Sequence, residues 1–166
     1  SALEVVLQDW AYGPVFRYLK TDLAGAARAE IDLLENYVIE HGIRGRAWQQ
    51  PDPWQYLRRY TLEEETVVAG PGQKALLEEI HRIRSRVTAP LLAFQRRIER
   101  RGRPGPTVRE LTTFLFQLLE DLKVARQLEA WKAEAEARGD LETAREHEQV
   151  WTRVLELFDQ IVEGLG

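Results

Sequence analysis

VFRYLKTDLAGAARAEIDLLENYVIEHGIRGRAW, residues 15–48, contains two amphipathic segments followed by a basic, aromatic loop. Residues 26–41 carry apolar side chains at steps of three and four, which predicts a helix with one apolar face. Gly42 stands where a left-handed residue closes a helix, and Ile43 where the apolar residue of a Schellman motif belongs. The stretch therefore predicts helices that pack through apolar stripes, and it contains no catalytic constellation.

The composition is that of a globular protein. Hydrophobic residues make up 44% and charged residues 30% of the 166 positions, and a chain of this length buries roughly 70% of its unfolded surface. No apolar run approaches the ~20 residues of a membrane-spanning helix. The absence of Cys excludes disulfides and thiolate-ligated metal sites within this sequence. We expect a cytoplasmic location, and the start at Ser1 in a sequence without Met indicates an excised piece of a longer chain.

The fold class expected is all-α, an irregular multi-helix bundle of about six to eight helices. The longest pattern, residues 73–101, predicts one long helix kinked near Pro90, or two helices joined there. Thr107 and Glu110 form a predicted capping box that opens a later helix. We expect residues 1–166 to form a single helical accessory domain, with a subdivision into 1–72 and 73–166 as the alternative.

Three further elements are predicted from turn and cap residues. Pro14 suits the first position of a helix, and Asp52 with Pro53 predicts the start of a short helix in WQYLRRY, residues 54–60. Asp140 is expected to cap the last helix. That helix is predicted to bury Trp151 as part of an apolar stripe formed by Ala144, Trp151, Val154, Leu155, Phe158, Ile161 and Val162.

A search for catalytic groups finds no complete motif. There is no GxxxxGK[ST] phosphate loop, and His147-Glu148 lacks the second His of a zinc-protease helix, because Trp151 stands in that position. His41 and His81 lie far from His147 in sequence, on separate predicted helices, and surface or helix-end roles are expected for all three. We therefore expect no catalytic, cofactor-binding or metal-binding residue, and no cofactor, in this chain.

Charge is distributed unevenly along the sequence. Residues 73–109 carry 10 basic and 3 acidic groups, whereas residues 110–166 carry 6 basic and 13 acidic groups. Pairs of arginines four apart share one side of a helix, so the arginines that end the long predicted helix could contact a row of phosphates. The alternative is that they neutralise acidic helices of the same domain. These arginines are Arg96, Arg97, Arg100, Arg101 and Arg103.

Basic and aromatic residues also alternate in a second region. The alternating residues are Arg44, Arg46, Trp48, Trp54, Tyr56, Arg58, Arg59 and Tyr60. This interleaving is typical of grooves for single-stranded nucleic acid, where a stacked base contributes ~1–3 kcal/mol. Large aromatic side chains more commonly fill gaps between helices, so core packing of both tryptophans is the alternative. Arg44, Arg46 and Trp48, together with the five arginines above, are the predicted nucleic-acid contacts.

Three runs together resemble one known family: VFRYLKTDL (15–23), IDLLENYVIEHGIRGRAW (31–48) and EHEQVWTRVLELFDQIVEGL (146–165). They resemble the B subunit of the bacterial AddAB-type ATP-dependent helicase/deoxyribonuclease, which processes double-strand DNA breaks for recombination. The resemblance covers most of the chain. It rests on long runs that are not active-site motifs.

The resemblance implies a non-catalytic part of a much longer chain. Family members have a helicase-like front portion and a nuclease portion whose iron–sulfur cluster is held by cysteines. This sequence has no Cys and no nucleotide loop, so no nucleotide-binding or nuclease residue carries over. The implied role is a helical accessory part of the helicase-like region, with an inserted 2B-type subdomain as one placement. The implied partners are the A subunit and the remainder of its own chain, with DNA as a candidate and no membrane.

Three functions follow as hypotheses. The first is direct DNA contact by the basic middle third. The second is a structural or protein-interaction module without direct DNA contact, since the apolar faces of so many amphipathic helices could exceed what one small core hides. The third, a stand-alone hydrolase that uses Glu or His, lacks a supporting constellation.

Overall fold

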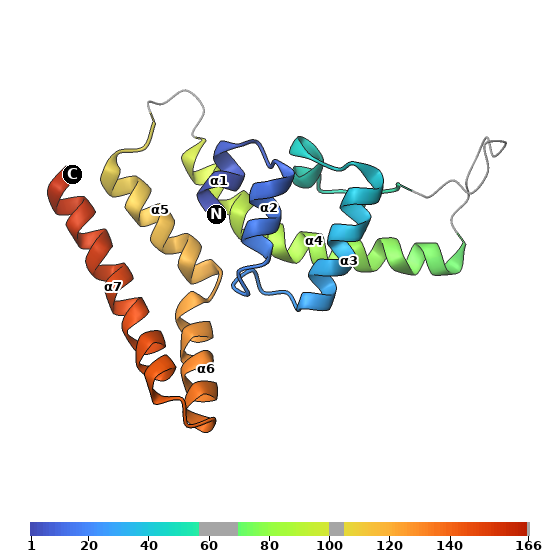
Figure 1. Cartoon of the computed structure of the whole chain (residues 1–166). Helices are drawn as coiled ribbons and strands as arrows, with labels where there is room; N and C mark the ends of the chain where they lie inside the picture. The colour runs from blue at the N-terminus through green and yellow to red at the C-terminus, as the bar shows by residue number, and fades with distance from the viewer. Residues whose placement is uncertain (57–69, 100–104, 166) are drawn as a thin grey trace. The chain divides into compact units, whose positions relative to one another are not determined.

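A computed structural model describes residues 1–56, 70–99 and 105–165, and these contain seven α-helices, one 3-10 helix and no strand. Figure 1 shows the helices in chain order. The predicted all-α class, with one long helix, is confirmed. The chain divides into two compact units, Ser1–Ala89 and Pro90–Gly166. The boundary between these units lies inside the long helix. The subdivision considered from the sequence, as the alternative to a single domain, lay between residues 72 and 73.

Unit 1 contains α1 (Ala2–Leu7), α2 (Tyr12–Leu19), α3 (Arg28–His41), the 3-10 helix η1 (Gly45–Gln49) and the first part of α4 (Pro71–Ile98). One polar bond crosses its core: the Tyr18 hydroxyl donates to the Val87 carbonyl at 3.2 Å. Burial raises the pKa of Tyr18 above its usual value. The core also contains the buried side chain of Arg84, and its apolar side chains include Val5, Trp10, Val15, Leu19, Ile31, Leu34, Val38, Ile80 and Ile83.

The ends of α3 follow from local chemistry. Gly42 has φ +60°, and the Ile43 N–H donates to the Val38 carbonyl at 3.0 Å, which confirms the Schellman motif. The helix begins at Arg28 rather than at residue 26. Ala27 precedes it and has no side-chain oxygen with which to cap, so only half of a capping box forms. In that half, the Glu30 carboxylate accepts from the Ala27 N–H at 2.9 Å.

Glu30 also ties α3 to α4. Its two carboxylate oxygens accept from Arg82 at 2.9 Å and from Arg86 at 2.6 Å. Hydrogen bonds from Arg86 and from the Ala27 N–H lower the pKa of Glu30 to about 2. Arg82 and Arg86, which belong to the basic region of residues 73–109, therefore neutralise a carboxylate of the same unit.

Two helix boundaries differ from the prediction. Pro14 is the third residue of α2 rather than the first, which still places its missing N–H in the first turn, where no intrahelical partner is needed. The short helix predicted from Asp52 does not begin there, because residues 53–56 have no regular structure and residues 57–60 lie outside the described residues. This segment is held instead by side-chain contacts of Trp54 and by a backbone contact of Asp52.

Pro90 lies inside α4, which continues across it as one helix. Of the two alternatives, one long helix or two helices joined at Pro90, the structure has the single helix. Leu91 and Phe94, which follow Pro90 at helical spacing, are fully buried. The kink near Pro90 stays a prediction.

Unit 2 continues from α4 with α5 (Val108–Asp121), α6 (Val124–Ala137) and α7 (Leu141–Leu165). The capping box of Thr107 and Glu110 is confirmed, with both reciprocal bonds present. Asp140 caps α7 by accepting from the Thr143 N–H at 3.1 Å. Gly139 precedes it with φ +77° and supplies the left-handed residue of the tight α6–α7 connection.

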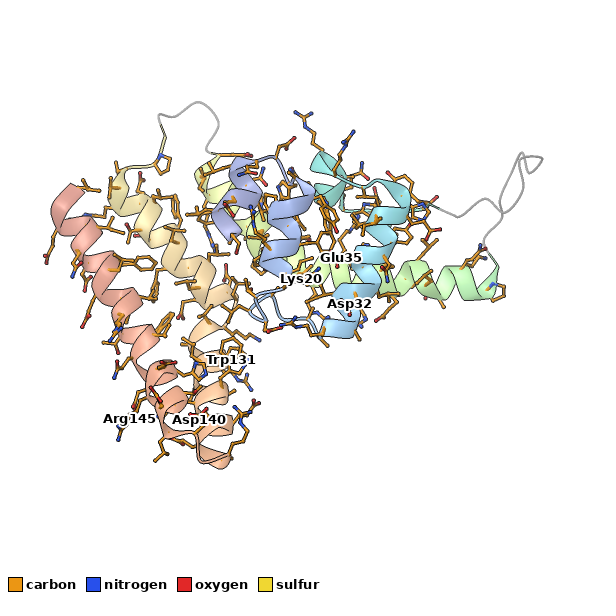
Figure 2. The ribbon with its side chains drawn as sticks, in the orientation of Figure 1. Lys20, Asp32, Glu35, Trp131, Asp140 and Arg145 are labelled. Atoms are coloured by element: carbon orange, nitrogen blue, oxygen red, sulfur yellow. The ribbon has the colours of Figure 1, made fainter. Side chains whose placement is uncertain are left out.

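The hairpin of α6 and α7 is fastened by two contacts between its helices. Lys132 and Glu148 form an ion pair at 2.9 Å, and the Trp131 and His147 rings lie 5.6 Å apart. Figure 2 shows Trp131 on α6, with Asp140 and Arg145 near the start of α7. Within α7, His147 is thus half-buried in a packing contact, whereas the sequence predicted a surface or helix-end position.

The apolar stripe of α7 is exposed to a degree that the sequence did not predict. Ala144 is the one fully buried residue of this helix. Trp151 is half-buried, with its ring 6.2 Å from that of Phe116 on α5. The prediction of a buried stripe was therefore wrong, because α5 and α6 cover part of this face and no other described element of unit 2 packs over the rest. None of the described helices combines the length and the apolarity that crossing a bilayer requires.

We predict that replacing Glu30 by Gln removes a pH-dependent part of the stability. The folded-state pKa of Glu30 lies below its unfolded value, so its contribution is present above pH ~4.5 and is lost as pH falls toward about 2. Glu30→Gln should lower the free energy of unfolding by about 1 kcal/mol at pH 7, since its ion pairs are partly exposed. Urea unfolding at pH 7 and pH 3 should show the gap to the native sequence narrowing at the lower pH. A gap that stays constant would contradict the assignment.

We predict that Trp151→Ala costs less stability than a smaller deletion in the core of the same unit. Trp151 is half-buried, whereas Leu128 on α6 is only 7% exposed. Trp151→Ala should cost about 1–2 kcal/mol and Leu128→Ala about 2–4 kcal/mol, since the cost follows the burial of the deleted atoms. Chemical denaturation of both variants checks the order, and the reverse order would mean that the α7 stripe is covered after all.

Candidate functional site

Arg44 and Arg46 lie where the chain passes from α3 into η1, and both side chains are exposed. Neither forms an ion pair among the described residues. Ile43 on one side of this loop and Trp48 on the other are buried, at 5% and 1% exposure. The two guanidinium groups are therefore presented to solvent by a segment that is anchored at both ends.

The backbone of this loop is fixed by a second turn. The Gly45 N–H donates to the Trp10 carbonyl at 3.2 Å. Gly45 has φ +61°, and a β-carbon there would lie 3.6 Å from the Asp9 carbonyl oxygen. Asp9 and Trp10 themselves have φ of +46° and +56°, which is uncommon for residues with side chains. Two left-handed turns thus support each other and set the position of the arginines on either side of Gly45.

Trp48 and Trp54 are core residues. The Trp48 ring meets Phe16 at 5.9 Å and Trp54 at 5.2 Å, both edge-on. The Trp54 indole N–H donates to the Ala47 carbonyl at 2.8 Å, and Trp54 is 3% exposed. The core-packing alternative holds for both rings. Trp48, which the sequence placed among the nucleic-acid contacts, cannot stack on a base in this structure because no face of its ring reaches solvent.

The aromatic series nevertheless continues to the surface. Tyr37 stacks on Trp54 with ring centroids 6.0 Å apart, and His41 lies 4.5 Å from Tyr37. Tyr56 then stacks on His41 at 5.8 Å and is 43% exposed. The Tyr37 hydroxyl donates to the Tyr56 carbonyl at 2.9 Å, and burial raises the pKa of Tyr37 to about 12. Tyr56 is thus an exposed ring on a rigid support, the property that a stacking contact needs.

Arg84 supports this region from within. Its side chain is 1% exposed, its guanidinium carbon lies 4.5 Å from the Trp54 ring centre, and its Nη2 donates to the Asp52 carbonyl at 2.8 Å. Desolvation lowers the pKa of Arg84 below its usual value. Its Nη1 and the Trp48 indole N–H are buried donors without a hydrogen-bond partner among the described residues. Arg84 is therefore a packing residue rather than a surface cation.

The five arginines predicted at the end of the long helix divide into three groups. Arg96 is exposed and has no ion pair among the described residues. Arg97 pairs with Asp121 of α5 at 3.1 Å, with both side chains partly exposed, so the neutralisation alternative applies to it. Residues 100–104, which include three of the predicted contacts (Arg100, Arg101 and Arg103), lie outside the described residues. Among the described candidates, Arg44, Arg46 and Arg96 remain available to an external anion.

Unit 2 contains a groove that no sequence motif indicates. It lies between α5 and α7 and has a volume of about 460 Å³. Its apolar lining residues, called the floor here, are Phe116, Leu155, Phe158 and Val162; its polar lining residues, called the rim, are Arg109, Thr112, Thr113 and Asp159. The hydroxyls of both threonines are bonded to carbonyls of their own helix. The sequence signal was the long apolar stripe of α7, which was interpreted as buried.

Other site chemistry is limited in the described part of the chain. It contains no group of three or more His, Asp or Glu side chains placed to hold a metal ion. Figure 2 shows Lys20 and Glu35 in unit 1. They form an ion pair at 2.7 Å, and the Tyr12 hydroxyl donates to the same carboxylate at 2.7 Å. This triad joins α2 to α3. Desolvation raises the pKa of Glu35, but the hydrogen bonds from Lys20 and Tyr12 together lower it by more, so its pKa lies below the usual value.

Comparison with known proteins gives a consistent result. No family model matches the chain. A protein of Symbiobacterium thermophilum, named as the B subunit of an ATP-dependent helicase/deoxyribonuclease, is 87% identical over all 166 residues. Proteins of the same name from Pelotomaculum thermopropionicum and Bacillus mycoides are 52% and 37% identical over the whole chain. In each case the chain spans 14% of the relative's length.

We predict that Gly45→Ala destabilises the loop that carries the two arginines. A residue with a β-carbon is strained at φ +61° although no atom lies closer than 3.6 Å, so the cost should be about 1 kcal/mol. Gly72→Ala is the matched control, because Gly72 lies in α4 with nothing within 4 Å of its β-carbon position. That variant should stabilise by about 0.5–1 kcal/mol. Equal effects in thermal unfolding would contradict the left-handed assignment.

Proposed function

Since the chain belongs to the family of ATP-dependent helicase/deoxyribonuclease B subunits, as a segment that spans 14% of their length, we propose that it is a non-catalytic helical accessory part of such a protein. In this proposal the parent complex processes double-strand DNA breaks for repair and recombination. The A subunit and the remainder of its own chain are its partners. The catalytic groups belong to the parts of the longer chain that lie outside this segment.

We propose that the segment contacts DNA through the Arg44–Arg46 loop of unit 1. The observation that carries this step is the pair of exposed arginines without ion pairs among the described residues, on a backbone locked by two left-handed turns. Arginines on a fixed backbone lose less backbone conformational entropy on binding phosphate than arginines on a mobile loop do. Other arginines of the same unit are engaged: Arg82 and Arg86 with Glu30, Arg17 with Glu4, and Arg28 with Asp22.

The exposed ring of Tyr56 extends this candidate interface toward single strands. Tyr56 stacks on His41, which in turn contacts Tyr37. Arg44 lies three residues after His41, the last residue of α3. A flat exposed ring suits base stacking, and arginines that follow the same helix suit neutralisation of the nucleic-acid backbone. A single-strand preference over duplex is therefore the expected behaviour.

We predict that the double variant Arg44→Ala/Arg46→Ala weakens DNA binding and flattens its salt dependence. Two lost phosphate contacts should reduce the slope of log affinity against log salt by about 1.4 on single strands and about 1.8 on duplex. The measurement is fluorescence anisotropy with a labelled oligonucleotide between ~50 and ~200 mM salt. The matched control, Arg17→Ala/Arg28→Ala, removes the same charge from two arginines that are already paired. It should leave the slope nearly unchanged.

Two outcomes would sink the DNA-contact proposal. One is that the native chain shows no binding at ~50 mM salt, where phosphate contacts are strongest. The other is that the control variant loses as much affinity as the loop variant. That second result would assign the effect to net charge instead of to a defined contact.

A second candidate function is a packing or protein-interaction module without direct DNA contact. It is favoured by one observation, the open apolar face of α7 in unit 2. Beyond the half-buried stripe, Val150 and Leu165 are 41% and 73% exposed. Apolar surface that a small unit leaves uncovered commonly marks an interaction site. The two functions occupy different units and are compatible.

A further inference from the structure

We propose that the groove between α5 and α7 is a docking site for an amphipathic helix with a basic flank, supplied by the remainder of the full-length parent chain. The proposal rests on the proposed function, because it requires this chain to be a segment of that longer protein. It goes further by naming the surface, the chemistry of the occupant and its source.

The shape of the groove suits a helix. Its walls are two helices that lie side by side in unit 2, as Figure 1 shows. Its floor offers Phe116, Leu155 and Phe158, spaced along the helices so that residues at successive turns of an incoming helix could meet them. Helix-in-groove recognition uses apolar anchors at i, i+3, i+4 and i+7 in this way. The threonine hydroxyls on the rim are bonded within α5, so the rim groups left to bind an occupant are the charged groups of Arg109 and Asp159.

The charge around the groove selects a basic occupant. α5 and α7 together carry nine carboxylates and three arginines. Glu156, Asp159 and Glu163 follow one another on α7 at steps of three and four, which places them on one side of the helix. Asp159 belongs to the groove rim. All three are exposed and have no ion pair among the described residues. Arg109 of α5 is the one cation among the lining residues, whereas α7 presents three carboxylates along the groove. A helix in the groove therefore passes along a row of carboxylates that outnumber the lining cation.

The same charges argue against a second copy of this chain as the occupant. Two copies meeting through this face would bring the carboxylate rows of both α7 helices together, which costs free energy unless cations intervene. A segment of the same polypeptide has the opposite advantage. The relatives extend far beyond the matched residues, since the chain spans 14% of their length. A tethered helix needs only weak intrinsic affinity, because its effective concentration is in the millimolar range for a short linker.

The first experiment tests the chemistry of the occupant on the 166-residue chain. The probes are two labelled helical peptides of about 18 residues, or five turns, with the same leucine stripe, one with lysines and the other with glutamates along its flank. We expect the lysine peptide to bind at least about tenfold more tightly, measured by fluorescence anisotropy at ~50 mM salt, where screening is weak. Equal binding of both peptides, or binding of neither, would overturn the proposal.

Matched variants place the binding on the groove. Phe158→Asp changes the floor and should abolish binding, whereas Leu157→Asp on the adjacent, 51% exposed position should leave it within about twofold. Asp159→Lys should reverse the peptide preference, and Glu142→Lys, the same charge change near the start of α7, should not. Circular dichroism checks folding. If Phe158→Asp unfolds the chain, the comparison of Asp159→Lys, at an exposed position, with Glu142→Lys still tests the proposal. A peptide preference that Asp159→Lys leaves unchanged would contradict it.

The second experiment tests the source of the occupant. The 166 residues replace the 87% identical segment in the full-length Symbiobacterium thermophilum protein, and hydroxyl-radical footprinting compares this chimera with the free chain. Oxidation of Phe116 and Phe158 should be about fivefold or more slower in the chimera, after correction by a radical dosimeter, because docking removes these rings from solvent. Equal rates would exclude the parent chain as the source. A dimer of the free chain that Phe158→Asp dissociates would assign the groove to a second copy instead.

The docking and DNA-contact proposals fail separately. The variants above lie on α7 in unit 2, and the DNA titration depends on Arg44 and Arg46 in unit 1. Loss of peptide binding with intact DNA binding would sink only the docking proposal. The reverse result would sink only the DNA contact.

Discussion

The buried guanidinium of Arg84, stacked on Trp54, is the contact on which the irregular part of unit 1 depends. It holds residues 52–54 to α4 through one carbonyl bond and one ring face. Trp54 in turn bonds the backbone of η1 through the Ala47 carbonyl. A cation that leaves water for such a site gives up hydration, which stacking and hydrogen bonds replace only in part. The arrangement fixes a loop that has no regular secondary structure of its own and gives the exposed arginines beyond it a rigid base.

Local features of the fold could be predicted from the sequence, whereas pairings between distant residues could not. The capping box at Thr107, the cap at Asp140 and the Schellman motif at Gly42 each depend on residues within a few positions of one another. The pairing of Glu30 with Arg82 and Arg86 joins positions more than fifty residues apart. Charge counts along the sequence therefore overstated the number of free cations in the middle third.

The candidate site was predicted in part for the same reason. Exposure of Arg44 and Arg46 followed from a polar loop after a helix end, but the burial of Trp48 between Phe16 and Trp54 depends on three separate segments. For α7 the sequence predicted the amphipathic pattern correctly, but it did not predict which elements cover the apolar face. A stripe of apolar residues specifies a face that avoids water, and the sequence of one segment does not say whether its own unit or another body covers that face.

The distribution of indole rings gives the molecule two separate optical reporters. Trp10, Trp48 and Trp54 are shielded in unit 1, while Trp131 and Trp151 are half-shielded in unit 2. Indoles in a dry environment emit at shorter wavelength and are less accessible to a collisional quencher than indoles in contact with solvent. The intrinsic emission of the native chain is therefore a sum of two populations, each confined to one unit. Loosening of either unit changes its own population and leaves the spectral signature of the other in place.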